Sequence, residues 1–379
     1  MLPPRLILVL GLPCFLGLIA FGCGDSGGES DAGTDAASLD ASAPDAGTDA
    51  GPDAAGERDA GEDVGPPVDA GPTIDAGGRG FAARYPLSAE YPESGIYDES
   101  AHRFFVGSLG DGIVRSVDAE TGAEETFFEE SAEGPWWTLG MDIDAERRRL
   151  WVCAMRDLRD ISDQDPPYDG YVWVFDLDTN ERVASHALSD AMPTGTCTDV
   201  ALAADGSAYV VDREHPVIYH VTFDGGAEIY AQDSLLDGGL VGQNALVVLP
   251  DQSGLLSAVY LPSRLVYIAL DTLEGEEPEV REVEIDGSFA DATPLSGADG
   301  MVYFDGAAYV IFASEIVRVQ PTLATWTHAV ASELSVPNGM TDAIVTPGGL
   351  YLVNGQSVRF ALGTTPDPFA LVRFEGSFD

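Results

Sequence analysis

From residue 80 to the end of the chain, hydrophobic positions come in short runs separated by polar turns rich in Gly and Asp. Hardly any segment shows a helical period, so the pattern predicts strands and turns throughout. The stretch 93–109, ESGIYDESAHRFFVGSL, is typical: a first strand, a tight polar turn, and a second strand rich in aromatic and branched residues. This unit recurs six times, each time followed by a third strand and often by a fourth.

The spacing of these units predicts the fold class. Units of about 40 to 60 residues that repeat six times indicate an all-β fold, a six-bladed β-propeller, in which radial closure protects the sheet edges. The segment 81–91 is expected to add a strand to the last blade and so close the ring. A β-sandwich is the competing all-β fold, and the period disfavours it. The second strands are expected at 103–108, 149–154, 207–212, 255–260, 307–312 and 349–354. The third strands are expected at 113–118, 171–176, 217–222, 265–270, 315–320 and 357–362.

The amino-terminal segment 1–22 has the pattern of an export signal. Arg5 supplies a positive charge, and residues 6–21 form an apolar run that is short for a membrane span. The run ends in IAFGC, which resembles a bacterial lipoprotein signal and predicts that Cys23 becomes the lipidated amino terminus. The residue after it, Gly24, is not the Asp of an inner-membrane retention signal. We therefore expect an exported lipoprotein of the outer membrane, with ordinary signal cleavage as the alternative.

The segment 23–79 repeats Asp-Ala-Gly and carries almost no large apolar residue. Such a segment cannot bury enough surface to offset its ordering entropy, so it predicts a disordered acidic tether ahead of a propeller at 80–379. The whole chain of 379 residues has a formal net charge of −46, and its 18 basic residues are all Arg. This charge argues against nucleic-acid binding, which needs basic surface.

Polar residues recur where the first strand of each unit begins. In a propeller these first strands all start at one mouth of the central channel, so the side chains at their starts are expected to converge. Carboxylate and amide oxygens are the ligands that Ca²⁺ and Mg²⁺ prefer. Each acid alone would more often cap a strand, but together, in register with the repeat, they favour a metal site. The start positions hold Glu93, Leu139, Thr198 with Asp199, Asn244, Asp299, and Thr341 with Asp342.

Three of these segments resemble the gluconolactonase and regucalcin family: ESGIYDE at 93, QNALVV at 243 and ADGMVYFDG at 298. The resemblance implies a six-bladed propeller with one divalent metal on its axis and, in many members, lactone hydrolysis. It carries over Glu93, Asn244 and Asp299 as metal ligands, and Asp299 also as the catalytic carboxylate, acting as base or nucleophile. Ca²⁺ is the expected ion, with Mg²⁺, Mn²⁺ and Zn²⁺ as alternatives.

A fourth segment, GTCTDVALAADG at 195, also matches the family but departs from it at two positions. Thr196 stands where the family pattern usually has a substrate-facing Arg, and Thr198 stands where it has an Asn. The resemblance implies that Thr198 and Asp199 face the substrate. Both substitutions fall at positions that the family uses at its active site, so the resemblance alone does not decide whether this chain is catalytic.

Loops at the same mouth are expected to set specificity. The long insertion 155–170 carries Arg156 and could form a lid, and the tryptophan pair that ends at Trp137 could line a substrate pocket. A solvated loop and a tryptophan packed between blades are the alternatives. A third loop, 212–215, offers an Arg and a His. Cys153 and Cys197 are the thiols of the folded part, and they form either a disulfide or a pair of buried free thiols.

Two functional classes follow from the sequence. The first is an envelope-tethered, metal-dependent hydrolase of lactones or related esters. The second is a noncatalytic, metal-containing propeller that binds a ligand or a protein partner, since one fold hosts many functions. In both, the expected partners are a small molecule and, through the lipid only, a membrane, and the expected state is a monomer.

Overall fold

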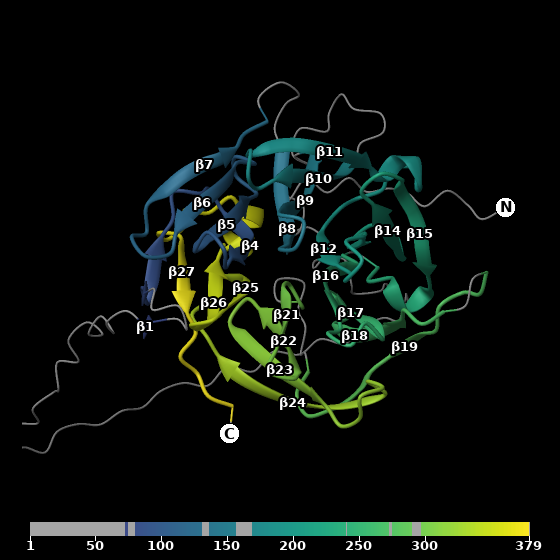
Figure 1. Cartoon of the computed structure of the whole chain (residues 1–379). Coiled ribbons are helices and arrows are strands. Elements are labelled where there is room, and N and C mark those ends of the chain that lie inside the picture. Colours follow the sequence, from purple (N-terminus) through teal and green to yellow (C-terminus); the bar gives the residue numbers. More distant parts are fainter. Residues whose placement is uncertain are drawn as a thin grey trace, which may run out of the picture. The chain divides into compact units, whose positions relative to one another are not determined.

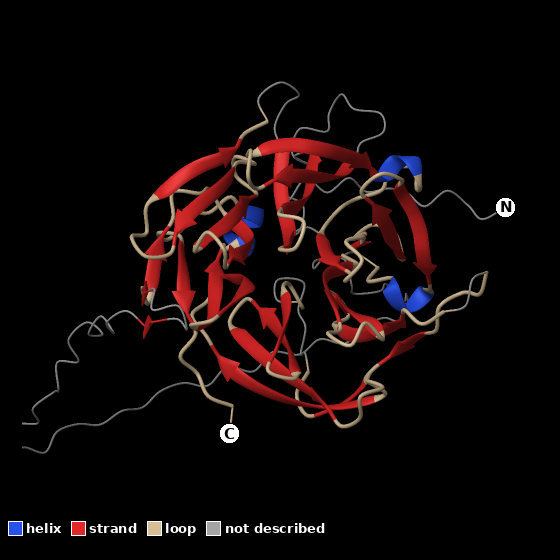
Figure 2. Cartoon of the chain, viewed as in Figure 1, coloured by secondary structure: helices blue, strands red, loops and turns tan. Residues whose placement is uncertain are grey.

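A computed structural model describes residues 73–74, 80–130, 136–156, 169–239, 241–272, 275–289 and 297–378. The expected signal, the lipidation site Cys23 and nearly all of the expected tether lie outside these residues, as does most of the insertion 155–170. Within the described part of the chain, strands make up almost all of the regular structure (Figure 2). No helix in that part is long and apolar enough to cross a membrane.

Six antiparallel sheets surround a common centre, and the first strand of each lies nearest to it (Figure 1). Successive first strands contact one another around the ring. The all-β six-bladed propeller is therefore confirmed. Blade 1 is β4 (Pro92–Asp98), β5 (Arg103–Ser108), β6 (Val114–Asp118) and β7 (Glu124–Phe128). Blade 2 is β8 (Trp136–Asp144), β9 (Arg149–Arg156), β10 (Gly170–Asp176) and β11 (Glu181–Ala187). Blade 3 is β12 (Asp199–Leu202), β13 (Ala208–Val211), β14 (Val217–Thr222) and β15 (Gly226–Gln232).

The second half of the ring repeats this plan with two additions. Blade 4 is β16 (Gln243–Val248), β17 (Gly254–Val259), β18 (Arg264–Ala269) and β19 (Val280–Glu282). Blade 5 is β21 (Met301–Phe304), β22 (Ala307–Phe312), β23 (Glu315–Pro321) and β24 (His328–Ser335), and β20 (Glu284–Asp286) joins β24 in parallel. Blade 6 is β25 (Met340–Thr346), β26 (Gly349–Asn354), β27 (Ala370–Arg373) and β3 (Arg84–Pro86). The remaining elements are β1 (Thr73–Ile74), which pairs with β2 (Gly80–Phe81), the short helices η3 (Leu188–Asp190) and η4 (Ser234–Leu236), and α1 (Ser357–Leu362).

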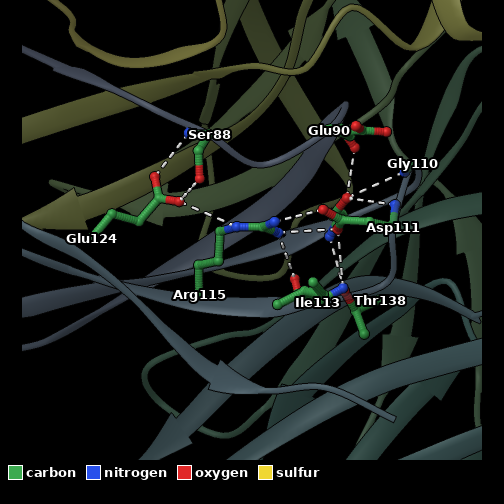
Figure 3. Close-up of polar contacts among 9 residues, drawn as sticks. Ser88, Glu90, Gly110, Asp111, Ile113, Arg115, Glu124 and Thr138 are labelled. Carbon is green, nitrogen blue, oxygen red and sulfur yellow. Dashed lines mark hydrogen bonds and ion pairs between the residues drawn. The ribbon is translucent and has the colours of Figure 1, made fainter. Parts of the chain in front are cut away.

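The ring closes as predicted, because β3 from the amino-terminal side pairs with β27 near the carboxyl terminus. Polar contacts fasten the chain between these strands and blade 1 (Figure 3). Arg115 lies between Asp111 and Glu124, with its Nη1 3.0 Å from Asp111 Oδ1 and its Nε 3.1 Å from Glu124 Oε1. Glu124 in turn accepts a hydrogen bond of 2.9 Å from the main-chain N–H of Ser88. The closing segment is thus held by charge-assisted bonds as well as by sheet pairing.

One predicted strand is wrong. The segment 357–362, SVRFAL, alternates like a strand but forms the helix α1, and the third strand of blade 6 is β27. Six residues are too few for periodicity to separate the two states. Gly363 ends the helix in the left-handed conformation, with φ of 61°. Phe360 packs its ring 5.0 Å from that of Tyr91, between the centroids, so tertiary contacts favour the helical form.

The hydrophobic core is divided into six clusters, one for each interface between neighbouring blades. Every blade therefore packs on two others. Blades 2 and 3 are also joined covalently, because Cys153 of β9 and Cys197, just ahead of β12, form a disulfide with their Cα atoms 5.1 Å apart. This settles the pairing that the sequence left open.

Candidate metal and substrate site at the channel mouth

The channel mouth is the end of the axis at which the six first strands begin. Glu93 lies at the start of β4, Asn244 at the start of β16, and Asp299 directly ahead of β21. All three are partly buried. Because corresponding positions of neighbouring blades face the same axis, the fold brings these side chains to one end of the channel.

Asp299 and Asn244 contact each other directly. Asn244 Nδ2 lies 2.5 Å from Asp299 Oδ1 and 3.2 Å from the Asp299 main-chain oxygen. On the other side, the hydroxyl of Ser357 in α1 donates to Asp299 Oδ2 at 3.4 Å. The carboxylate is therefore oriented from two blades. Ser357 is not among the predicted site residues, because its segment has the sequence pattern of a strand.

The acids at the mouth are in a strongly unfavourable electrostatic position. Burial, and then the charge of Asp342, raise the pKa of Asp299 to about 7. Burial raises the pKa of Glu93 well above its ordinary value, and the negative charges of Asp299, Asp342 and Asp199 raise it further. Among the described residues, Arg213 is the basic side chain whose charge opposes both shifts.

A second group of acids lies deeper and has an evident structural role. Asp199 accepts a hydrogen bond of 2.8 Å from the N–H of Leu246, in the first strand of the next blade. Asp142 does the same with Leu202 at 2.9 Å, and Asp342 with Gly95 at 3.4 Å. Each acid thus satisfies an N–H on the inner edge of the following blade, where no further strand pairs.

These deeper acids line a cavity of about 230 Å³ along the axis. The fit of Asp199 depends on a small neighbour, since a Cβ at Gly140 would lie 2.0 Å from Asp199 Oδ1. Burial raises the pKa of Asp142 to about 6 and that of Asp342 to about 7. The prediction that Asp199 binds substrate is not tested by these contacts, although both of its oxygens already accept main-chain bonds.

The two threonines that depart from the family pattern are both buried, and they differ in their contacts. Thr196 Oγ1 donates to Asp212 Oδ1 at 2.5 Å, and its N–H donates to Asp212 Oδ2 at 3.0 Å. Burial opposes ionisation of Asp212, but hydrogen bonds from His215, Thr196 and Tyr219 outweigh it and lower its pKa. Thr198 Oγ1, by contrast, is closed off from solvent and has no hydrogen-bond partner in the described part of the chain.

Two further predicted substrate contacts lie at blade 2. The ring of Trp137 is 2% exposed and packs 5.8 Å from Phe360 of α1. Arg156 lies over the ring of Trp136, with its Cζ 5.2 Å from the ring centroid, and forms an ion pair with Asp169 at 4.0 Å. Whether either side chain contacts a substrate stays a prediction.

The donor set fits a hard divalent cation on chemical grounds. Glu93 and Asp299 supply carboxylate oxygens, Asn244 supplies an amide, and Thr198 places an unpartnered oxygen at the same level of the repeat. Among the described residues, no group of three or more Asp, Glu, His or Cys side chains could hold a metal ion by itself. A metal at the mouth would therefore need the Asn244 amide, after its side chain turns its oxygen inward, and solvent oxygens.

Comparison with known proteins places the fold. No family model matches the sequence, and no curated protein matches it either. Among solved structures, a gluconolactonase from Xanthomonas campestris is similar with a TM-score of 0.53 and 14% identity, covering 80% of this chain and 94% of that one. A luciferin-regenerating enzyme has a TM-score of 0.54 at 11% identity, covering 77% and 95% of the two chains. The PQQ-bound aldose sugar dehydrogenase of Streptomyces coelicolor has a TM-score of 0.52 at 14% identity, covering 76% and 95%.

The chain is thus a six-bladed β-propeller whose structural neighbours include both gluconolactonase-type and sugar dehydrogenase propellers. Identities this low show the shared fold alone.

Proposed function

We propose that this protein is a divalent-metal-dependent hydrolase of lactones or related esters, with its active site at the channel mouth. The observation that carries the proposal is the convergence of oxygen donors from blades 1, 4 and 5: Glu93, Asn244 and Asp299. Ca²⁺ is the ion that this set suits best. When bound, the cation would supply Lewis-acid polarisation of the carbonyl group.

The residues themselves define the remaining steps. Asp299 is the working carboxylate, because Ser357 holds its Oδ2 and Asn244 holds its Oδ1 until the Asn244 amide turns its oxygen toward a metal, so that its orientation is set before substrate arrives. It accepts a proton from water at Oδ2 as the water oxygen bonds to the carbonyl carbon. The ring C–O bond then breaks, and the proton passes to the departing alkoxide oxygen. One lactone and one water thus give one hydroxycarboxylic acid.

A panel of lactones and aryl esters tests this function with the purified full chain and added Ca²⁺, Mg²⁺ or Mn²⁺. We expect turnover that chelator abolishes and that Asp299→Asn lowers by several orders of magnitude, with the melting curve kept. Asp205→Asn, which removes an exposed acid from the turn between β12 and β13, is the matched control. No turnover in the wild type, with metal bound, would contradict the hydrolase.

That last result would support the second candidate, a binding propeller in which the metal is structural. The observation that favours it is that position 196 holds a threonine in place of a basic residue, and that this threonine is hydrogen-bonded to Asp212. The same contact predicts that Thr196→Arg destabilises the fold, because a fully buried hydroxyl would be replaced by a large cation.

We further propose that the protein is exported and held at the outer membrane through a lipid on Cys23. The support is the apolar run that ends at this cysteine. Cys23→Ala should release the protein from membranes into the soluble fraction. If the Cys23→Ala variant stays bound to membranes after an alkaline wash, the lipid anchor is contradicted.

A further inference from the structure

Arg213 lies at the channel mouth in the loop between β13 and β14, and its main chain is fixed from two blades. Its N–H donates to Thr196 Oγ1 at 3.1 Å, and its carbonyl oxygen accepts from the N–H of Gly242, ahead of blade 4, at 2.9 Å. A Cβ at Gly242 would lie 2.7 Å from that oxygen, so the loop is closely seated. Thr196, held by Asp212, thus positions the residue that follows Asp212.

The guanidinium of Arg213 has an N–H donor, at Nε, that no described residue accepts from. The loop of Arg213 follows β13 at the end where β12 begins, because Val211 pairs with Asp199. Arg213 therefore lies at the same mouth as Glu93 and Asp299, and its charge opposes the rise in the pKa of both acids. In the described part of the chain it forms one ion pair, from Nε to Glu214 Oε1 at 3.6 Å, which is too long for a hydrogen bond. Its Nε is closed off from solvent and makes no hydrogen bond to any described residue. A buried cationic donor without an acceptor is costly unless a ligand supplies one.

The charges and donors at the mouth indicate which ligand would do so. With a divalent cation between Glu93 and Asp299, two positive charges offset two negative ones. Glu214 opposes the charge of Arg213 at 3.6 Å without forming a hydrogen bond, so Arg213 keeps an N–H donor at Nε that needs an acceptor. Asp199 and Asp342 lie deeper and are occupied by main-chain N–H groups. The fork of an Arg matches the two oxygens of a carboxylate, which a Lys does not.

We propose that Arg213 binds the carboxylate of a hydroxycarboxylate ligand, the ring-opened product of lactone hydrolysis, and the corresponding carbonyl oxygen of the substrate. The identity of this ligand rests on the proposed function. Arg213 is then a specificity-determining residue, and Thr196 and Asp212 are its positioning residues.

The test is calorimetric binding to the full chain saturated with Ca²⁺. The probe is 4-hydroxybutyrate, and its uncharged match is 4-hydroxybutyramide. Arg213→Gln should weaken binding of the carboxylate roughly 10- to 100-fold, the range for hydrogen bonds to a charged group, and leave the amide unchanged. Arg213→Lys should fall between the two, because the charge is kept and the fork is lost. The control is Arg147→Gln, which removes the same charge from the β8–β9 turn at the far end of the channel.

A second measurement separates ligand binding from a structural role. Removing a cation from beside a cation site should leave Ca²⁺ affinity equal or tighter, whereas a disturbed fold would weaken it. Equal carboxylate affinity in wild type and Arg213→Gln overturns the inference, as does joint loss of Ca²⁺ and carboxylate binding, or no binding of the probe to wild type. Arg213-dependent binding without any lactone turnover would sink the hydrolase and keep the carboxylate site.

Discussion

The two ends of the channel hold buried acids in opposite electrostatic states. At the far end, Asp98 is 2% exposed and pairs with Arg148, with Oδ1 2.9 Å from Nη1, and with Arg103 at 3.5 Å. Burial opposes its ionisation, but these partners outweigh burial and lower its pKa. At the mouth, Asp299 has an amide, a hydroxyl and other acids around it, and its pKa rises to about 7.

The contrast between Asp98 and Asp299 distinguishes acids that stabilise the fold from acids that are expected to bind a ligand. An acid that is paired with arginines holds two blades together, since Asp98 belongs to blade 1 and Arg148 to the β8–β9 turn of blade 2. The acids at the mouth outnumber the one described cation that opposes their pKa shifts, Arg213, so they cost stability, and a protein retains such acids where a ligand offsets the cost. At the mouth, the disulfide joins blades 2 and 3, and Asp212 bonds the segment that enters blade 3 through Thr196.

The largest stability effect is expected from the disulfide at the mouth. Replacing Cys153 and Cys197 together by Ala frees a segment with a sequence separation of 44 residues. The chain-entropy model then predicts a loss of about 4 kcal/mol in the free energy of unfolding. Denaturant titration measures the loss, and reductant should lower the midpoint of wild type but not of the double variant. An unchanged midpoint in the double variant would show that the mouth does not depend on this bond.

The next effect compares the two ends directly. Asp98→Asn removes the buried carboxylate that Arg148 and Arg103 share, leaves Arg148 with its weaker pair to the exposed Asp178, and should cost about 3 kcal/mol. The same substitution at Asp299 removes a desolvated charge and should leave the stability of the metal-free protein unchanged or raised. Denaturant curves in chelator give both values. Equal losses at the two ends would contradict the distinction between paired and unpaired acids.

A smaller effect should appear in the pH dependence of the metal-free protein. Asp142 and Asp342 have folded pKa values of about 6 and about 7, above the ordinary value near 4. Between these values the folded state binds more protons than the unfolded state, so stability falls as pH rises from about 4 to about 7, by at most about 1.4 kcal/mol per pH unit for each group. Melting temperatures across this range in chelator test the sign.

Asp98 has the opposite sign, because its lowered pKa stabilises the fold above the unfolded value and loses that contribution as the solution becomes more acidic. Asp342→Asn should therefore make the fall in the free energy of unfolding between pH 4 and 7 less steep, by up to about 1.4 kcal/mol per pH unit, because one titrating group is removed. Asp98→Asn should leave that slope in place. Part of the decline should remain in each variant, because Asp299, Glu93 and Asp199 also have raised pKa values. A decline as steep in Asp342→Asn as in wild type would contradict the role of Asp342.

The smallest effect concerns the threonine pair. Thr198→Val replaces a buried hydroxyl that has no partner among the described residues, so stability should change by no more than about 0.5 kcal/mol. Thr196→Val is the matched control, and loss of its bond to Asp212 should cost about 2 kcal/mol. Calorimetric unfolding of both variants measures the contrast, and similar losses would show that the Thr198 hydroxyl is bonded in solution.

The blades could be predicted from the sequence because they follow from a repeat, although β8 begins at Trp136, three residues before the expected start position Leu139. The period-two alternation of the strands, together with the polar turns between them, locates β5, β22 and β26 to the residue. The register of the repeat then places Glu93, Asn244 and Asp299 at one mouth. The surroundings of these residues could not be predicted. Ser357 contacts Asp299 from a segment that is a helix and not the expected strand. The loop that carries Arg213 is held by Gly242, which lies ahead of the next blade.

The proposed function depends first on whether Glu93 and Asp299 bind a divalent cation. The deciding measurement is calorimetric titration of Ca²⁺ into the metal-free full chain, with melting temperature followed in parallel. We expect one saturable site in wild type and in the exposed-acid control Asp205→Asn, with about 2.7 kcal/mol of added stability at 100 times the dissociation constant. Glu93→Gln and Asp299→Asn should each weaken the site at least about 10-fold. Wild-type affinity in both variants, or a wild-type melting curve that Ca²⁺ leaves unmoved, would contradict the proposed site.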